Sequence, residues 1–138
     1  MFLGRPGSAA TVDARIAGYC EALEQASGDR EPIVCRKNPE DKGQVKVALA
    51  KAHPDGLVCA NDFTATHLLK TLTELGVAVP AKMRLAGIDD VKYASLISVP
   101  LTTLHQPCAD MGAIAVSTML ERLRNPRLSP RDILLKKS

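Results

Sequence analysis

The stretch PDGLVCAND, residues 54–62, decides the fold of this chain. Its centre, residues 56–60, is a continuous apolar run of strand length, bounded on both sides by residues that favour turns. Such runs are typical of a parallel strand that is buried on both faces of its sheet. The polar pair Asn61-Asp62 then stands at the carboxyl end of the predicted strand.

Helical patterns flank this strand on both sides. Residues 43–53 and residues 62–75 repeat apolar side chains at helical spacing. Further out, the chain predicts strands at residues 2–3, 32–36, 83–88 and 100–104, and helices at residues 9–26 and 109–124. Strands that alternate with helices indicate an α/β fold, a doubly wound parallel sheet flanked by helices.

Capping and turn residues mark the ends of these elements. Ser8 is expected to cap the first helix, and Asp62 the helix that follows the central strand. Gly76 is expected to close that second helix. Residues 89–96 predict a loop or a short helical turn, and residues 131–136 predict a last strand.

The composition is that of a globular protein and argues against several classes. Hydrophobic residues make up 46% and charged residues 24% of the 138 residues, close to the average for a folded domain. A net charge of +3 is too small to indicate a nucleic-acid surface by itself. Aromatic residues make up only 3%, which argues against lectin-type sugar platforms and stacked single-stranded nucleic acid.

Cysteine spacing and the apolar pattern bear on the cellular compartment. No C-x-x-C pair occurs, so we expect reduced thiols at all four cysteines, which are Cys20, Cys35, Cys59 and Cys108. The first residues show no signal-peptide pattern, and no apolar stretch approaches the length of a membrane span. We therefore expect a cytoplasmic protein without membrane contact.

Ligands of doubly wound sheets bind beyond the carboxyl ends of the strands. Four segments follow predicted strand ends, at residues 4–8, 35–38, 61–63 and 89–93. Asn61 is a candidate ligand contact, because Asp62 suffices to cap the following helix. Asp89 and Asp90 follow another strand, and each is either a ligand contact or a helix cap.

Arg15 lies on the first predicted helix, beside the apolar face that includes Ile16. It is either a solvated helix side chain or a guanidinium that reaches into a cleft and binds hydroxyl or carboxylate oxygens. The chain shows no nucleophile motif, no metal-ligand spacing and no phosphate-binding glycine pattern. We therefore expect no catalytic site, no metal and no cofactor.

Five segments occur in one order along the chain: RIAGY at 15–19, DGLVCAND at 55–62, LGV at 75–77 with Pro80, LAGIDD at 85–90, and PLTTLHQ at 100–106. Together they resemble the effector-binding domain of LacI/GalR-type transcriptional regulators, which has the type I periplasmic-binding-protein fold. Each segment alone is weak, but the five in register cover almost the whole chain. The resemblance implies the C-terminal subdomain together with a fragment of the N-terminal subdomain.

The resemblance also implies where an effector binds. The positions that match the family's pocket are Arg15, Asn61, Asp89 and Gln106. Residues 1–104 would form the C-terminal subdomain, and residues 105–138 the crossover, a helix of the N-terminal subdomain and the final strand. In this family an effector binds between the two subdomains and shifts their orientation, which changes operator affinity through a DNA-binding headpiece.

The partners implied are a small sugar-like effector, a second copy of the chain in a homodimer, and DNA through an N-terminal headpiece that this chain does not include. An uncovered sheet edge and apolar surface also favour self-association. Two alternatives stay open, namely a fragment of a periplasmic-type sugar-binding protein and a doubly wound α/β enzyme domain. The effector's identity, and whether the regulator represses or activates, are open as well.

Overall fold

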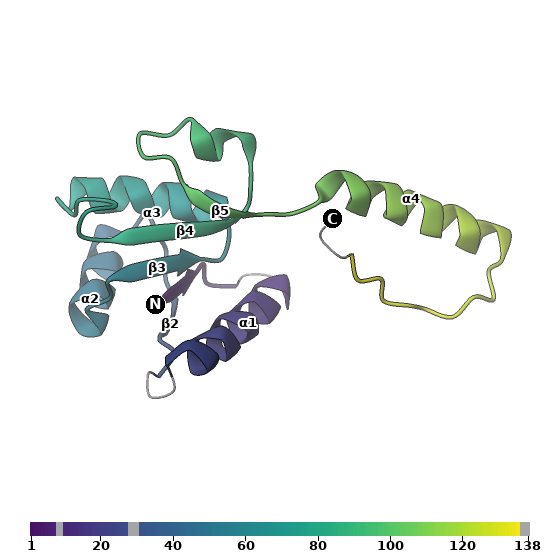
Figure 1. Cartoon of the computed structure of the whole chain (residues 1–138), viewed down its shortest axis with the longest axis horizontal. Helices are drawn as coiled ribbons and strands as arrows, with labels where there is room; N and C mark the ends of the chain where they lie inside the picture. Colours follow the sequence, from purple (N-terminus) through teal and green to yellow (C-terminus); the bar gives the residue numbers. More distant parts are fainter. Residues whose placement is uncertain (8–9, 28–30, 136–138) are drawn as a thin grey trace. The chain divides into compact units, whose positions relative to one another are not determined.

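The computed structural model describes residues 1–7, 10–27 and 31–135 of the chain. The chain divides into two compact units, Met1–His105 and Gln106–Ser138. The first unit holds a parallel sheet with helices packed on it, and the second holds one long helix and an extended segment (Figure 1).

Within the described residues, the first unit has a sheet of five parallel strands in the order β2-β1-β3-β4-β5. The strands are β1 (Phe2–Gly4), β2 (Val34–Arg36), β3 (Gly56–Cys59), β4 (Arg84–Asp89) and β5 (Thr102–His105). The predicted apolar run thus forms β3, in the middle of the sheet between β1 and β4. Because every pairing is parallel, the carboxyl ends of the strands lie at one edge (Figure 1).

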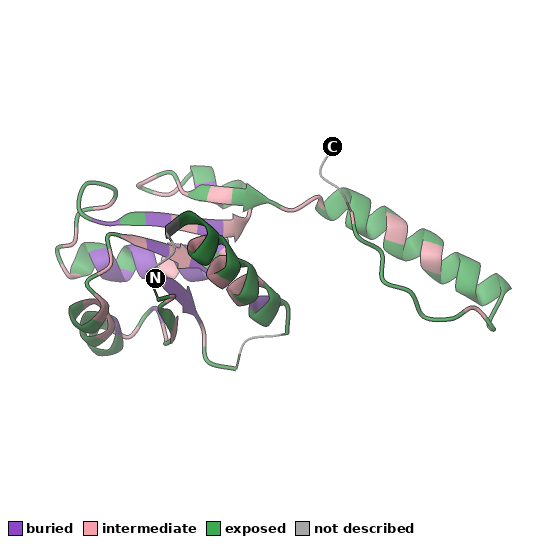
Figure 2. Ribbon diagram, turned by 60° about the horizontal axis from the view of Figure 1, so that its bottom comes forward, coloured by how far each residue is buried: buried purple, intermediate pink, exposed green. Residues whose placement is uncertain are grey.

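Successive side chains of a strand point to opposite faces of the sheet, and each face has its own hydrophobic core. The helices that cover the faces are α1 (Ala10–Ser27), α2 (Lys42–Ala52) and α3 (Asp62–Glu74). Leu3 and Leu57 point to the larger core, where they pack with α2 and α3. Phe2 and Val58 point to the opposite face and pack with α1. The predicted doubly wound α/β fold is therefore confirmed, and Figure 2 shows its buried interior.

Capping side chains and a glycine mark the ends of the helices. Asp41 caps α2, because its carboxylate accepts a hydrogen bond from the backbone of Gln44 at 2.9 Å. Gly76 follows the end of α3 with a φ of 74°, as predicted. The predicted turn after β4 is the 3-10 helix η1 (Lys92–Ser95). The predicted cap Ser8 lies outside the described residues.

The second unit carries α4 (Cys108–Arg124), in which no residue is buried (Figure 2). Leu123 on α4 is 69% exposed, and Leu134 in the segment beyond α4 is 92% exposed. The predicted last strand was wrong over the part that the structure describes, since residues 131–135 are extended but form no strand. A strand needs a neighbour for its backbone hydrogen bonds, and the described part of this unit contains none.

None of the helices in the described ranges combines the length and the apolar character that a bilayer crossing requires.

Candidate functional site

Polar side chains from three elements meet at the carboxyl edge of the sheet. Asn61 and Asp62 connect β3 with α3, and Asp89 is the last residue of β4. Arg15 reaches this edge from α1. In doubly wound sheets this is the edge where ligands bind, so the geometry brings three of the predicted site residues to the expected place.

Arg15 links the ends of β3 and β4. Its Nη1 donates a hydrogen bond to the Ala60 carbonyl oxygen, and its Nη2 donates to Asp89 Oδ1 at 2.9 Å. The side chains of Arg15 and Asp89 are 19% and 28% exposed, so solvent still reaches the pair. These contacts exclude the alternative of a solvated helix side chain for Arg15. The pair presents donor and acceptor groups side by side, which suits neighbouring hydroxyl groups of a polyol.

Asn61, and not Asp62, caps α3. The side-chain Oδ1 of Asn61 accepts a hydrogen bond from the backbone nitrogen of Thr64 at 2.8 Å. The prediction that Asp62 caps this helix was therefore wrong. Since the cap uses only the oxygen of the Asn61 amide, its nitrogen carries two N–H donors that the cap does not use.

Asp62 is fully buried and connects the segments after β3 and β4 with β5. Its Oδ2 accepts a hydrogen bond from Val91 N at 3.0 Å, and its Oδ1 accepts one from Thr103 Oγ1 at 2.6 Å. Thr103 Oγ1 in turn accepts a hydrogen bond from Asp90 N at 3.1 Å. A buried carboxylate is tolerated only where such bonds replace water. Asp62 therefore holds the loop after β4 against β5.

The two acids at the end of β4 have unusual backbone conformations. Asp89 has a φ of 128° and Asp90 a φ of 57°, a region that non-glycine residues rarely adopt. Each such residue costs about 1–3 kcal/mol, and strain of this kind clusters at functional sites. Neither acid is a helix cap, because Val91 precedes η1 and no side chain caps it. Asp90 instead pairs with His105, Oδ2 to Nδ1, at 2.8 Å.

Tyr93 borders this cluster from η1. Burial raises the pKa of its phenol, and the nearby carboxylates of Asp62 and Asp89 raise that pKa further. The phenol therefore keeps its proton at neutral pH. With 40% of its surface exposed, Tyr93 presents an O–H group that can donate a hydrogen bond at this edge.

A second cluster, which sequence analysis missed, lies beyond β1 and β2. The Arg5 guanidinium lies over the Phe63 ring, 5.0 Å from its centroid, and Arg5 Nη1 is 3.4 Å from Glu40 Oε2. His67 Nε2 is 3.3 Å from Glu40 Oε1. Phe63 is 50% exposed, so its ring offers an apolar face beside polar groups. An aromatic residue directly after the pair Asn61-Asp62 was the signal that could have revealed it.

Gln106 begins the second unit, directly after β5. Its role as an effector contact stays a prediction.

Metal and thiol chemistry can be checked over the described ranges. There, no group of three or more His, Cys, Asp or Glu residues could hold a metal ion. The cysteines are free thiols, as predicted. Burial raises the pKa of the Cys59 thiol, so this group behaves as part of the apolar core.

Residues 1–138 match the family model of the periplasmic binding protein-like domain. The chain belongs to this family. This periplasmic binding protein-like domain is 29% identical over 126 residues to the ribose operon repressor of Haemophilus influenzae, and 31% identical over 130 residues to the transcriptional repressor PurR of Escherichia coli. The alignments cover 88% and 86% of this chain but 38% and 36% of the relatives. The chain thus spans little more than a third of either relative's length.

Solved structures share the fold of the domain. A LacI family transcriptional regulator from Enterococcus faecalis, solved with bound ribose, has a TM-score of 0.77 at 24% identity and covers 92% of this chain and 46% of its own. The lac repressor dimer, solved with operator and an anti-inducer, has a TM-score of 0.75 at 25% identity over the same shares. The predicted resemblance to LacI/GalR-type effector-binding domains is therefore confirmed.

Proposed function

We propose that this domain is the effector-sensing part of a LacI-type transcriptional regulator and that it binds a small sugar-like molecule without chemical turnover. The observation that carries the proposal is the Arg15–Asp89 ion pair at the carboxyl edge of the sheet. Two comparisons support the ligand class, since the E. faecalis regulator binds ribose and the H. influenzae relative is the repressor of a ribose operon.

Each site residue has a distinct task in this proposal. Arg15 donates hydrogen bonds to hydroxyl oxygens, while Asp89 accepts hydrogen bonds from the hydroxyl groups of the same molecule. Asn61 donates through the amide nitrogen that its capping role leaves unused. Gln106 contributes from the second unit, and the exposed Phe63 ring offers an apolar surface for the C–H face of a sugar.

The proposed signal runs through the connections between the elements. We assign residues 1–104 to the C-terminal subdomain and residues 105–138 to the crossover, a helix of the N-terminal subdomain and the final segment. The hydrogen bond from Asp90 N to Thr103 Oγ1 connects the loop beside Asp89 with β5, and the chain continues from β5 into the second unit. An effector that prefers one orientation of the two subdomains shifts their equilibrium.

In the whole regulator, this shift changes the affinity of a DNA-binding headpiece for its operator in the cytoplasm. The alternative of a doubly wound enzyme finds no support in the two named relatives, both of which are repressors.

Homodimer formation belongs to the same proposal. The first unit exposes apolar side chains around η1, where Leu96 is 83% and Tyr93 40% exposed. Neighbouring exposed apolar side chains favour association when they form a contiguous patch. The solved lac repressor is a dimer, which supports pairing of this domain with a second copy.

The test is a titration of the whole ¹⁵N-labelled chain with D-ribose, followed by amide chemical shifts. We expect saturable shifts at the residues around Arg15, Asn61 and Asp89. Asp89→Asn keeps the shape of the side chain but removes its charge, and should weaken binding at least about tenfold, since a hydrogen bond to a charged group contributes about 1.5–3 kcal/mol. Glu24→Gln, an exposed change on α1, is the matched control and should bind as the wild type does.

Two results would contradict the proposal. Equal ribose affinity in Asp89→Asn and the wild type would show that Asp89 is not a ligand contact. Tighter binding of a purine base than of any pentose or hexose would show that the ligand class is wrong.

A further inference from the structure

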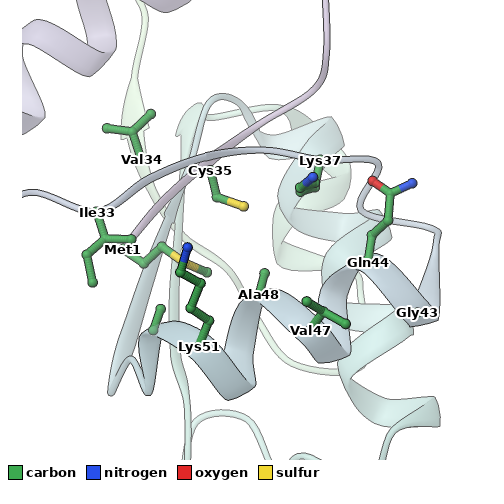
Figure 3. A pocket seen from close by; sticks show the side chains of 11 residues that line it. Met1, Ile33, Val34, Cys35, Lys37, Gly43, Gln44, Val47, Ala48 and Lys51 are labelled. Carbon is green, nitrogen blue, oxygen red and sulfur yellow. The ribbon is translucent and has the colours of Figure 1, made fainter.

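A hollow in the described part of the first unit lies apart from the Arg15–Asp89 pair. It has a volume of about 630 Å³ and runs along α2 beside the edge strand β2 (Figure 3). Its lining extends from Met1 and Ile33, before β2, to Lys37, which follows it. Cavities of about 300–1,000 Å³ are typical of small-molecule sites. None of the proposed effector contacts lines this hollow.

The lining of the hollow is mostly apolar and is exposed to solvent. Ile33, directly before β2, is 42% exposed, and Val47 on α2 is 69% exposed. Helix α2 packs its other face into the core through Val45, so Val47 is left for a contact outside the core. Apolar side chains that gather in a concave surface favour an apolar guest over water.

The charged side chains among the described lining residues are all positive. Lys37 and Lys51 line the hollow, and none of the described lining residues is acidic. Neither lysine forms an ion pair with any residue in the described ranges. Figure 3 shows the Lys51 side chain rising from α2 into the hollow. Two unpaired ammonium groups on an apolar cavity complement a guest that has one anionic end and one apolar end.

We propose that this hollow is a second binding site, distinct from the effector site, for an unbranched medium-chain carboxylate. The hydrocarbon chain lies against Ile33, Cys35 and Val47, and the carboxylate lies between Lys37 and Lys51. A neutral sugar is a poor occupant, because its hydroxyl groups would lose water against apolar side chains without gaining hydrogen-bond partners.

The test is a titration of the whole chain with sodium hexanoate, octanoate and decanoate below their micellar concentrations, followed by amide chemical shifts. We expect shifts confined to β2, its flanking residues and α2. Each methylene buried contributes about 0.8 kcal/mol, so affinity should rise by up to about fourfold for each methylene added. Decyltrimethylammonium has a chain of the same length with the opposite charge, and should bind at least about tenfold more weakly than decanoate.

Two lysines on the same helix provide the matched variants. Lys51→Glu reverses a charge inside the hollow and should weaken decanoate binding at least about fivefold, whereas Lys46→Glu makes the same change at an exposed position outside the lining. Val47→Asp should abolish binding while the tyrosine fluorescence of the folded unit stays unchanged. The proposal is overturned by equal losses in Lys51→Glu and Lys46→Glu, by equal binding of both head groups, or by affinity that does not grow with chain length.

Discussion

Replacing Gly87 by alanine tests whether Asp62 holds the ends of the strands together. Gly87 lies in β4, buried against the start of α3. A Cβ atom at this position would lie 2.1 Å from Asp62 Oδ1, 3.0 Å from Leu101 Cδ2 and 3.2 Å from Asp62 Cα. The carboxylate cannot simply swing away, because the same oxygen accepts the hydrogen bond of Thr103 Oγ1 at 2.6 Å.

The expected loss has two physical sources. Forcing an extra methyl group into a packed site costs about 1–3 kcal/mol. Displacing the Asp62 carboxylate from its partners leaves a buried group unsatisfied, at a cost of about 1–3 kcal/mol. We therefore expect Gly87→Ala to lower the free energy of unfolding by about 4 kcal/mol, a large share of the stability of an ordinary domain. For a unit of this size the midpoint temperature should fall by about 18 °C.

Urea unfolding followed by tyrosine fluorescence measures this loss. Both tyrosines, Tyr19 and Tyr93, lie in the first unit and the chain has no tryptophan, so the signal reports that unit alone. Gly18→Ala is the control, since a Cβ there meets no atom within 4 Å. In a helix this change should add about 0.5–1 kcal/mol. A Gly87→Ala protein within about 1 kcal/mol of the wild type would refute the reasoning.

Three further predictions concern a hydrogen bond, two thiols and a helix cap. Thr103→Val removes the hydroxyl that bonds Asp62, and should lower the free energy of unfolding by about 1–3 kcal/mol in the same assay. Alkylation of the native protein should label the exposed Cys108 and spare Cys59, whose thiol pKa is raised by burial, as read by mass spectrometry. Hydrogen bonds from the backbone and side chain of the first turn of α2 lower the pKa of Asp41. Its charged cap therefore stabilises the fold above the ordinary carboxyl pKa, and this contribution is lost as the pH falls through the lowered value.

Each of these predictions has an outcome that contradicts it. Thr102→Val changes an exposed neighbour, and an equal loss there would show that the Thr103 hydroxyl has no special part. Rapid labelling of Cys59 in folded protein would contradict its burial. Asp41→Asn should be less stable than the wild type at neutral pH and equally stable in strong acid, so a gap that persists in acid would contradict the pKa argument.

Local patterns predicted much of the fold, because they act over a few residues. The apolar run at residues 56–60 predicted β3, and helical spacing predicted the inward faces of α1 and α3. The periodic pattern was sufficient to predict these faces, because one face of a helix is buried when apolar residues recur on that face in each successive turn. The segment at residues 131–135 did not follow its pattern, since an apolar run becomes a strand only beside a partner.

The roles of Asn61 and Asp62 could not be predicted from the neighbouring residues alone. Both side chains can cap a helix, so the sequence did not distinguish between them. The structure decides the matter through Thr103, which follows 41 residues after Asp62 and donates to its carboxylate. Because that bond and the bond from Val91 occupy the buried carboxylate of Asp62, Asn61 caps α3 instead.

The sequence by itself determined the order of strands and helices, the parallel sheet and the family, because these depend on periodicity and on short motifs. Only the tertiary structure decided which of the predicted site residues are in contact. Arg15 and Asp89 are 74 residues apart in the chain, and their ion pair exists because α1 begins and β4 ends at the same edge of the sheet. No periodicity reports such a contact, since it depends on the packing of the whole unit.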